Sequence, residues 1–171
     1  MAIVIGVLDY LPRLSHQTRV VRGDMAPAFV LETATGERVD IADHQGRQAL
    51  LLVFIPGYRC SSCRVQLQKL DSEVERMTAV GALVLVIGDD AILDAKRIAA
   101  DVSPGVRLLI DRTFAVAHRY GMNEPGRPYS LAGYVVVDRR GRVLAHDVDP
   151  MFGDHRAKIA RLVHEAANVD E

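Results

Sequence analysis

The chain has 171 residues and a formal net charge of −1, from 21 lysines and arginines against 22 aspartates and glutamates. This balance argues against nucleic acid or a membrane surface as a partner, because both attract strongly basic patches. Hydrophobic residues make up 49% of the sequence, which predicts a folded domain rather than a disordered chain. No apolar run approaches membrane-spanning length, and the apolar start at residues 1–8 lacks the basic lead and cleavage site of a signal peptide, so we expect a cytoplasmic protein.

Strand and helix patterns alternate from about residue 26 onward. Residues 28–32 and 38–41 flank a short turn and predict a β-hairpin. Residues 49–55 form a continuous apolar run, as expected for a strand buried on both faces, and the breaker pair Pro56-Gly57 ends it. The next apolar residues recur at spacings of three and four, which predicts one helix with a single apolar face. They are Cys63, Leu67, Leu70, Val74 and Met77.

The second half of the chain continues the alternation and ends in a hairpin and a helix. We expect a strand at 82–87, a helix at 92–102, a strand at 106–110, a short helix at 113–120, two hairpin strands at 133–138 and 142–147, and an amphipathic helix at about 154–167. This order predicts an α/β fold in which a mixed central sheet carries helices on both faces, with a hairpin extension at its N-terminal side. We expect a single domain over residues 23–171, preceded by an N-terminal extension at 1–22.

The two cysteines, Cys60 and Cys63, lie three positions apart where a buried strand gives way to a helix. A helix N-terminus carries unpaired N–H groups and the positive end of the macrodipole, so a thiolate there is stabilised and its pKa falls. The second sulfur is close enough to form a disulfide afterwards. Permanent structural disulfides are rare in the cytoplasm, so the pair predicts a redox-active dithiol that needs no bound cofactor.

A metal site is the main alternative use for the same two sulfurs. A structural zinc takes four ligands, whereas the sequence offers no second cysteine pair and no histidine within twenty residues downstream. We therefore predict no structural metal. Copper(I) takes only two or three soft ligands, which leaves a copper(I)-binding thiol carrier as an alternative. A redox-inactive adaptor is a further alternative.

Three segments add motifs in a fixed order along the chain. Residues 23–29 are Gly-Asp-Met-Ala-Pro-Ala-Phe, residues 54–64 place Pro56 four positions before the first cysteine, and residues 135–138 are Val-Val-Val-Asp ahead of a glycine turn. Together they resemble the AhpC/TSA (peroxiredoxin-like) redoxins of the thioredoxin-like superfamily. The resemblance spans roughly residues 23–165. It implies a thioredoxin-like fold and a thiol-dependent oxidoreductase that acts on disulfides or hydroperoxides.

The resemblance implies two catalytic patterns that assign opposite roles to the sulfurs. In the Cys-x-x-Cys pattern, Cys60 attacks a disulfide and Cys63 resolves the mixed disulfide. In the peroxiredoxin pattern Pro-x-x-x-Thr-x-x-Cys, Pro56 and Cys63 keep their spacing and Cys60 stands in the place of the threonine. Cys63 would then attack peroxide and condense with Cys60. Both patterns imply a thiol reductant, such as a thioredoxin system, as the source of electrons.

Five further residues are candidates to support the dithiol. Arg59 and Arg64 flank the pair and would lower a thiolate pKa if they pointed inward, and the alternative is that both are solvated charges. Tyr58 either shields the sulfurs or packs on the sheet. Ala132 occupies the position in which thioredoxins carry a cis-proline and peroxiredoxins an arginine. Arg127, five residues upstream, is the candidate to supply that missing charge.

Asp89 and Asp90 follow a buried strand at its carboxyl end, where sites in α/β sheets gather, but we interpret them as an N-cap for the helix that begins near residue 91.

The apolar N-terminal segment would add a strand or contact a partner subunit, so we expect a homodimer.

Overall fold

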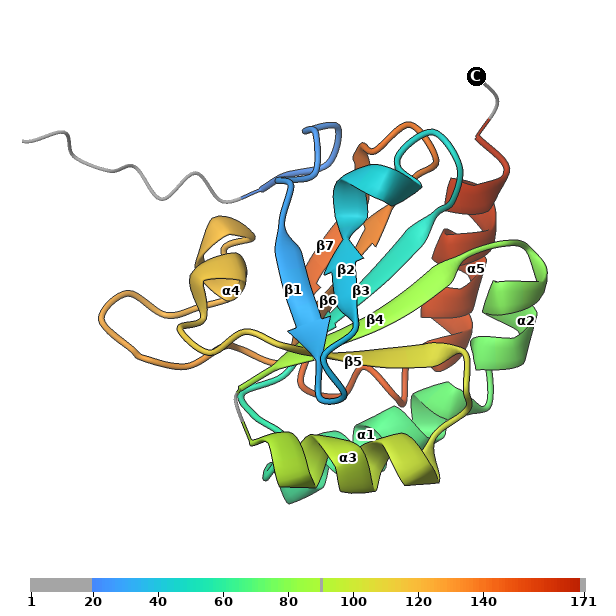
Figure 1. Ribbon diagram of the computed structural model, residues 1–171. Coiled ribbons are helices and arrows are strands. Elements are labelled where there is room, and N and C mark those ends of the chain that lie inside the picture. The colour runs from blue at the N-terminus through green and yellow to red at the C-terminus, as the bar shows by residue number, and fades with distance from the viewer. Residues whose placement is uncertain (1–19, 90, 170–171) are drawn as a thin grey trace, which may run out of the picture.

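The computed structural model describes residues 20–89 and 91–169, which form a seven-stranded mixed sheet with the strand order β2-β1-β5-β4-β3-β6-β7 (Figure 1). The strands are β1 (Val30–Thr33), β2 (Arg38–Asp40), β3 (Leu50–Phe54), β4 (Leu83–Gly88), β5 (Val106–Ile110), β6 (Gly133–Val137) and β7 (Val143–Val148). The helices are α1 (Ser61–Asp71), α2 (Val74–Ala79), α3 (Ile92–Asp101), α4 (Ala115–Arg119) and α5 (Arg156–Ala167), with a short 3-10 helix, η1 (Ile41–His44), after β2.

Three parallel strands form the middle of the sheet. β4 lies between β3 and β5, and every residue of β3 and β4 is buried. Strands covered on both faces need apolar side chains at every position, which is why the sequence shows continuous apolar runs there. The three predicted strands are confirmed, and their carboxyl ends share one edge of the sheet.

Antiparallel strands complete the sheet on both sides. β1 pairs with β2 as a hairpin and also with β5, while β6 pairs with β3 and then with β7. Both hairpins expected from the sequence are therefore confirmed. Gly133, the first residue of β6, lies opposite Phe54, the last residue of β3. The start of β6 thus reaches the edge of the sheet from which the cysteine-containing loop departs.

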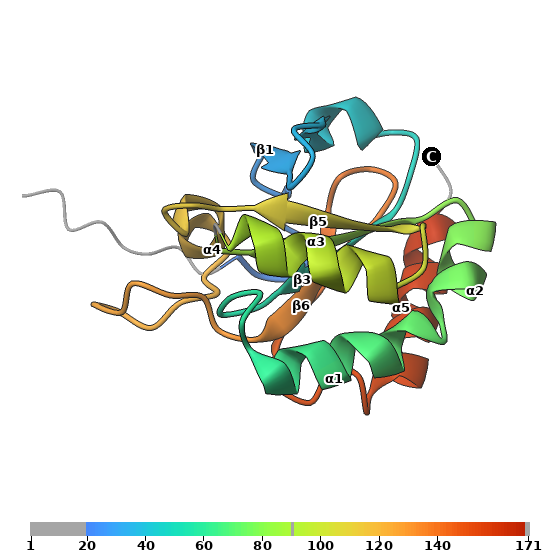
Figure 2. The same ribbon diagram turned by 60° about the horizontal axis from the view of Figure 1, so that its bottom comes forward.

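Helices cover both faces of the sheet, as predicted (Figure 2). Side chains of α1, α2, α3 and α5 pack into one core cluster with one face of the central strands. On the opposite face, α4 and η1 pack with the segment that precedes β1. Among the described residues, none of the helices combines the length and apolar character required to cross a membrane.

One predicted helix is divided in two. The expected helix over residues 63–77 ends at Asp71, and α2 begins at Val74. The hydroxyl of Ser72 donates to the carbonyl oxygen of Lys69 at 2.9 Å, so a side chain competes for a group at the end of the helix. All five residues of the predicted apolar face are nevertheless buried, because both helices pack on the same core.

The predictions for the N-terminal segment concern residues 1–19, which lie outside the described residues. The proposed division between an extension at 1–22 and a domain at 23–171 stays a prediction.

Candidate functional site

Cys60 and Cys63 lie at the N-terminus of α1, directly after the loop that leaves β3. The structure joins them by a disulfide, with their Cα atoms 5.2 Å apart. Cys60 is the N-cap of α1, and its Sγ accepts the backbone N–H of Cys63 at an Sγ–N distance of 3.2 Å. The Oγ of Ser62 lies 3.3 Å from the same sulfur. Cys60 Sγ therefore occupies the position at which a helix N-terminus stabilises negative charge.

The two sulfur-bearing residues differ in accessibility. Cys60 is partly exposed and is followed by two exposed serines, whereas Cys63 is only 5% exposed and belongs to the hydrophobic core. The difference follows from the apolar stripe of α1, which turns Cys63 toward the sheet while the capping residue stays at the helix end. A molecule arriving from solvent meets Cys60 first.

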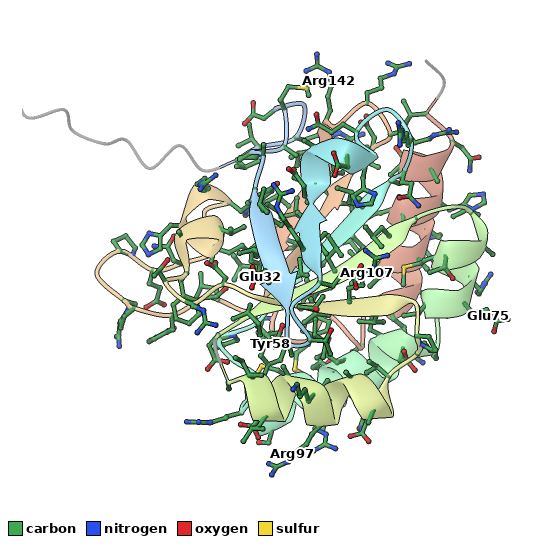
Figure 3. All side chains as sticks on the ribbon, viewed as in Figure 1. Glu32, Tyr58, Glu75, Arg97, Arg107 and Arg142 are labelled. Atoms are coloured by element: carbon green, nitrogen blue, oxygen red, sulfur yellow. A yellow bond between two sulfur atoms is a disulfide. The ribbon has the colours of Figure 1, made fainter. Side chains whose placement is uncertain are left out.

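Tyr58 is buried between the sheet and the layer formed by α1 and α3 (Figure 3). Its hydroxyl donates to the carbonyl oxygens of Val86 and Leu109, at 3.1 and 2.6 Å. Burial raises the pKa of Tyr58 well above its ordinary value of 10.0, and the negative charge of Asp89 adds to the rise. Of the two interpretations offered by the sequence, the structure places Tyr58 in packing on the sheet, where it anchors the loop in front of the dithiol.

Space for that tyrosine ring is provided by Gly88. A Cβ atom on Gly88 would lie 2.9 Å from Cε2 of Tyr58, which is closer than real Cβ contacts. Pro56, which is partly buried, follows the last residues that pair with β4 and begins the loop. Proline has no N–H to continue the pairing, so the chain leaves the sheet there and turns toward α1.

The two arginines that flank the dithiol are ion-paired with α3. Arg59 Nε lies 3.2 Å from Asp94 Oδ2, and the Arg59 side chain is 80% exposed. Arg64 pairs with Asp101 at the other end of α3. Both charges are thus partly neutralised by carboxylates. This arrangement matches the interpretation of solvated charges rather than inward-pointing ones.

Arg127 and Ala132 occupy different places relative to the dithiol. Arg127 lies in an exposed loop, where its Nε is 3.4 Å from Glu124 Oε2 and its guanidinium lies 5.9 Å from the ring centre of Tyr129. Its recorded contacts therefore stay within its own loop, which extends beside α4 (Figures 1 and 2). Ala132 immediately precedes β6, at the edge of the sheet where the dithiol loop departs, and its carbonyl oxygen accepts the N–H of Asp149 at 3.0 Å.

Asp89 contacts the loop of the dithiol, a role that sequence reasoning missed. Its Oδ1 accepts the backbone N–H of Tyr58 at 3.0 Å and that of Ala91 at 3.3 Å. The expectation that Asp89 is the N-cap residue of α3 is wrong, because the N-cap is Ala91, whose own side chain makes no capping hydrogen bond. Asp90, the other residue of that expectation, lies outside the described residues. The place of Asp89 at the carboxyl end of a buried strand was the available sequence indication.

Gln66 is a second residue that the sequence did not single out. It is only 4% exposed on the inner face of α1, and its Oε1 accepts the N–H of Asp154 at 3.2 Å. Lys69, on the same helix, lies 2.6 Å from Asp154 Oδ1, and this hydrogen bond lowers the pKa of that carboxyl. The segment before α5 therefore braces the helix that carries the dithiol. A polar residue on the apolar stripe of the helix was the available indication.

No group of three or more histidine, cysteine, aspartate or glutamate side chains is placed to share a metal ion in the part of the chain that the structure describes. The copper(I) alternative stays a prediction.

A mixed sheet with helices on both faces and a dithiol at the start of the helix after a central strand define a thioredoxin-like protein. The protein-family model described as "AhpC/TSA family" matches residues 22–146, and the chain belongs to that family. The chain is also 32% identical over 100 residues to Peroxiredoxin Bcp from Escherichia coli (strain K12). That match covers 58% of this chain and 64% of the relative, so it spans less than two thirds of the relative's length.

Solved structures share the fold. Peroxidoxin BcpB from Mycobacterium tuberculosis is 19% identical, with a TM-score of 0.74 over 89% of this chain and 99% of that one. A "putative Thiol:disulfide interchange protein DsbE" from Chlorobium tepidum is 24% identical, with a TM-score of 0.69 over 87% and 99% of the two chains. The predicted thioredoxin-like fold and the predicted family are thereby confirmed.

Proposed function

We propose that this protein is a thiol-dependent oxidoreductase that cycles Cys60 and Cys63 between dithiol and disulfide, with Cys60 as the sulfur that meets the substrate. The supporting observation is that the two sulfurs share the start of one helix but differ in access, since Cys63 is 5% exposed and Cys60 partly exposed. Membership of the AhpC/TSA family and the similarity to Peroxiredoxin Bcp support hydroperoxides as one class of oxidant.

In the oxidising half of the cycle, the Cys60 thiolate attacks. With a hydroperoxide, the sulfur takes the terminal oxygen, the O–O bond breaks, the alcohol or water leaves, and Cys60 becomes a sulfenic acid. The Cys63 thiolate then attacks Cys60 Sγ, which releases water and forms the disulfide. With a disulfide substrate, Cys60 forms a mixed disulfide and Cys63 displaces the second product thiol. Either substrate gains two electrons and the dithiol loses two.

In the reducing half of the cycle, an external thiolate attacks the accessible sulfur of Cys60. The bond to Cys63 breaks, and Cys63 leaves as a thiolate within the first turn of α1, where the helix N-terminus stabilises it. A second thiol on the reductant then attacks the mixed disulfide, frees Cys60 and completes a two-electron transfer. A dithiol protein of the thioredoxin type suits this step, because it carries both thiols.

The charges around the site bear on which oxidant is preferred. The resemblance to peroxiredoxins implies an arginine near the reacting sulfur, but Arg59, Arg64 and Arg127 each pair with a carboxylate. This arrangement supports disulfide exchange more directly than rapid peroxide reduction. We therefore propose disulfides and hydroperoxides as the two substrate classes, to be separated by their second-order rate constants with the reduced protein.

Single substitutions of the two cysteines test the assignment of roles. Cys63→Ser should trap a mixed disulfide at Cys60, visible by mass spectrometry, and Cys60→Ser should lose the reduction of a model protein disulfide. The opposite pattern, with a sulfenic acid detectable in Cys60→Ser after addition of hydrogen peroxide, would instead make Cys63 the attacking sulfur. Slow reaction of the wild-type protein with both substrates would contradict the proposed function.

A cytoplasmic setting and a homodimer belong to the same proposal. The first depends on the balanced composition and the argument from cysteine usage, and the second on the apolar segment at residues 1–8, which lies outside the described residues. Analytical ultracentrifugation of the full chain, with and without a reductant, measures the second directly.

A further inference from the structure

We propose that Asp89 is a positioning residue for Cys60, and that it acts by holding the turn at residues 57–60 against the start of α3. The inference rests on the proposed function, because it concerns the sulfur that we expect to react. It adds a residue outside the dithiol segment to the site. Asp89 comes directly after β4, the strand that neighbours β3 in the sheet.

A single carboxylate oxygen of Asp89 joins two segments that are far apart in the chain. Oδ1 accepts the backbone N–H of Tyr58, in the loop that leaves β3, and that of Ala91, the N-cap of α3. Hydrogen bonds to a charged acceptor are stronger than those between neutral groups. The carboxylate therefore ties the dithiol loop to the segment that begins α3.

The other carboxylate oxygen packs directly on Gly57. A Cβ atom at Gly57 would lie 2.5 Å from Asp89 Oδ2 and 2.8 Å from Cγ, so a residue with a side chain would push the carboxylate away. Gly57 is also the first residue of the turn, because its carbonyl oxygen accepts the N–H of Cys60 at 3.2 Å. Gly57 therefore links the two residues, because it packs on Asp89 and is hydrogen-bonded to the backbone of Cys60.

The position of Cys60 determines how strongly α1 stabilises its thiolate. Cys60 Sγ accepts the N–H of Cys63. If the sulfur keeps this position in the reduced protein, its thiolate lies next to the N–H groups at the N-terminus of α1, which stabilise negative charge. Loss of the anchor at Asp89 should let the turn move and weaken that interaction. The negative charge of Asp89 acts in the opposite direction, since a nearby anion disfavours a thiolate.

Asparagine separates the two effects of Asp89. It keeps an oxygen at the Oδ1 position, which can still accept both N–H groups, but it removes the charge. Neither substitution removes a partner of Arg59 or Arg64, the charged residues that flank the dithiol and pair with α3. Positioning by hydrogen bonds therefore predicts that Asp89→Asn keeps the reactivity of Cys60 and that Asp89→Ala loses it.

The experiment measures the pH profile of Cys60 alkylation by iodoacetamide in reduced protein carrying Cys63→Ser, so that only one thiol reacts. Asp89→Ala should raise the apparent pKa of Cys60 and slow alkylation at neutral pH by about fivefold, the size of effect expected when a capping interaction is lost. Asp89→Asn should match the parent or react slightly faster. Asp138→Ala is the matched control, because Asp138 also accepts a backbone N–H, from Arg142 at 2.8 Å, but in the β6–β7 turn.

The possible outcomes separate this inference from the proposed function. An unchanged profile in folded Asp89→Ala, or an equal change in Asp138→Ala, would overturn the positioning role. If Asp89→Ala fails to fold, Gly57→Ala replaces it, because that variant displaces the carboxylate without removing it and should also raise the pKa of Cys60. If the wild-type dithiol reacts with neither disulfide nor hydroperoxide, the proposed function fails, whatever the profiles of the Asp89 variants show.

Discussion

The hydroxyl of Tyr58 provides a quantitative test of how the dithiol loop is anchored. Tyr58→Phe keeps the ring in its place beside Gly88 but removes the hydrogen that is shared by the carbonyl oxygens of Val86 and Leu109. Leaving a buried polar group without its partner costs about 1–3 kcal/mol. For a chain of 171 residues each kcal/mol corresponds to about 2–4 °C in Tm, so we expect a decrease of about 2–12 °C.

Urea unfolding of the reduced and the oxidised protein measures the loss in free energy of unfolding, and thermal unfolding measures the decrease in Tm. Tyr129→Phe is the control, because Tyr129 is exposed at the surface. The anchoring role would be refuted if Tyr58→Phe lowered the free energy of unfolding by no more than Tyr129→Phe does.

The difference in free energy of unfolding between wild type and Tyr58→Phe should also depend on pH. The pKa of Tyr58 is raised by burial above its ordinary value of 10.0, so the folded state holds this proton more tightly than the unfolded state does. The contribution of Tyr58 to stability is therefore complete below about pH 10 and is lost as the pH rises from there through the folded-state pKa. The stability difference between wild type and Tyr58→Phe should shrink above pH 10, whereas a constant difference would contradict the buried environment.

Four further substitutions test other parts of the site. Gly88→Ala places a Cβ atom 2.9 Å from the tyrosine ring, so urea unfolding should show a loss of about 1–3 kcal/mol, and an unchanged midpoint would contradict the close packing. Arg59→Ala and Arg64→Ala should each leave the rate of Cys60 alkylation within about twofold, because both arginines pair with carboxylates on α3; a tenfold decrease would show that they stabilise the thiolate directly. Gln66→Ala removes the side-chain oxygen that accepts the N–H of Asp154 at 3.2 Å. Because that N–H also donates to the carbonyl oxygen of Met151 at 2.8 Å, the free energy of unfolding should fall by about 0.5–1.5 kcal/mol, and an unchanged value would contradict the brace on α1.

The parts of the fold that the sequence predicts are those determined by local pattern. The apolar runs at 49–55 and 82–87 correspond to β3 and β4 within one residue at each end, because a strand covered on both faces has few alternatives to an apolar side chain at each position. The dithiol was placed correctly at a strand-to-helix junction for a similar reason. A breaker pair followed by residues with helical spacing determines where one element ends and the next begins.

The contacts that sequence reasoning missed depend on segments distant in the chain. Nothing near Arg59 or Arg64 in the sequence indicates that α3, some 30 residues later, would present Asp94 and Asp101 to them. The role of Asp89 likewise depends on the adjacency of β3 and β4, which brings the ends of both strands to one edge. The break between α1 and α2 was missed because the apolar stripe continues through it without a change in spacing.

The pairing of the flanking arginines changes how the thiolate of this protein is stabilised. With Arg59 and Arg64 engaged by carboxylates, the groups that contact Cys60 Sγ directly are the backbone N–H of Cys63 and the hydroxyl of Ser62, both in the first turn of α1. Charges on exposed side chains are screened by salt, whereas backbone N–H groups in contact with a sulfur are screened much less. Thiolate stabilisation in this protein should therefore depend on the geometry of the loop, which Tyr58 and Asp89 hold, more than on ionic strength.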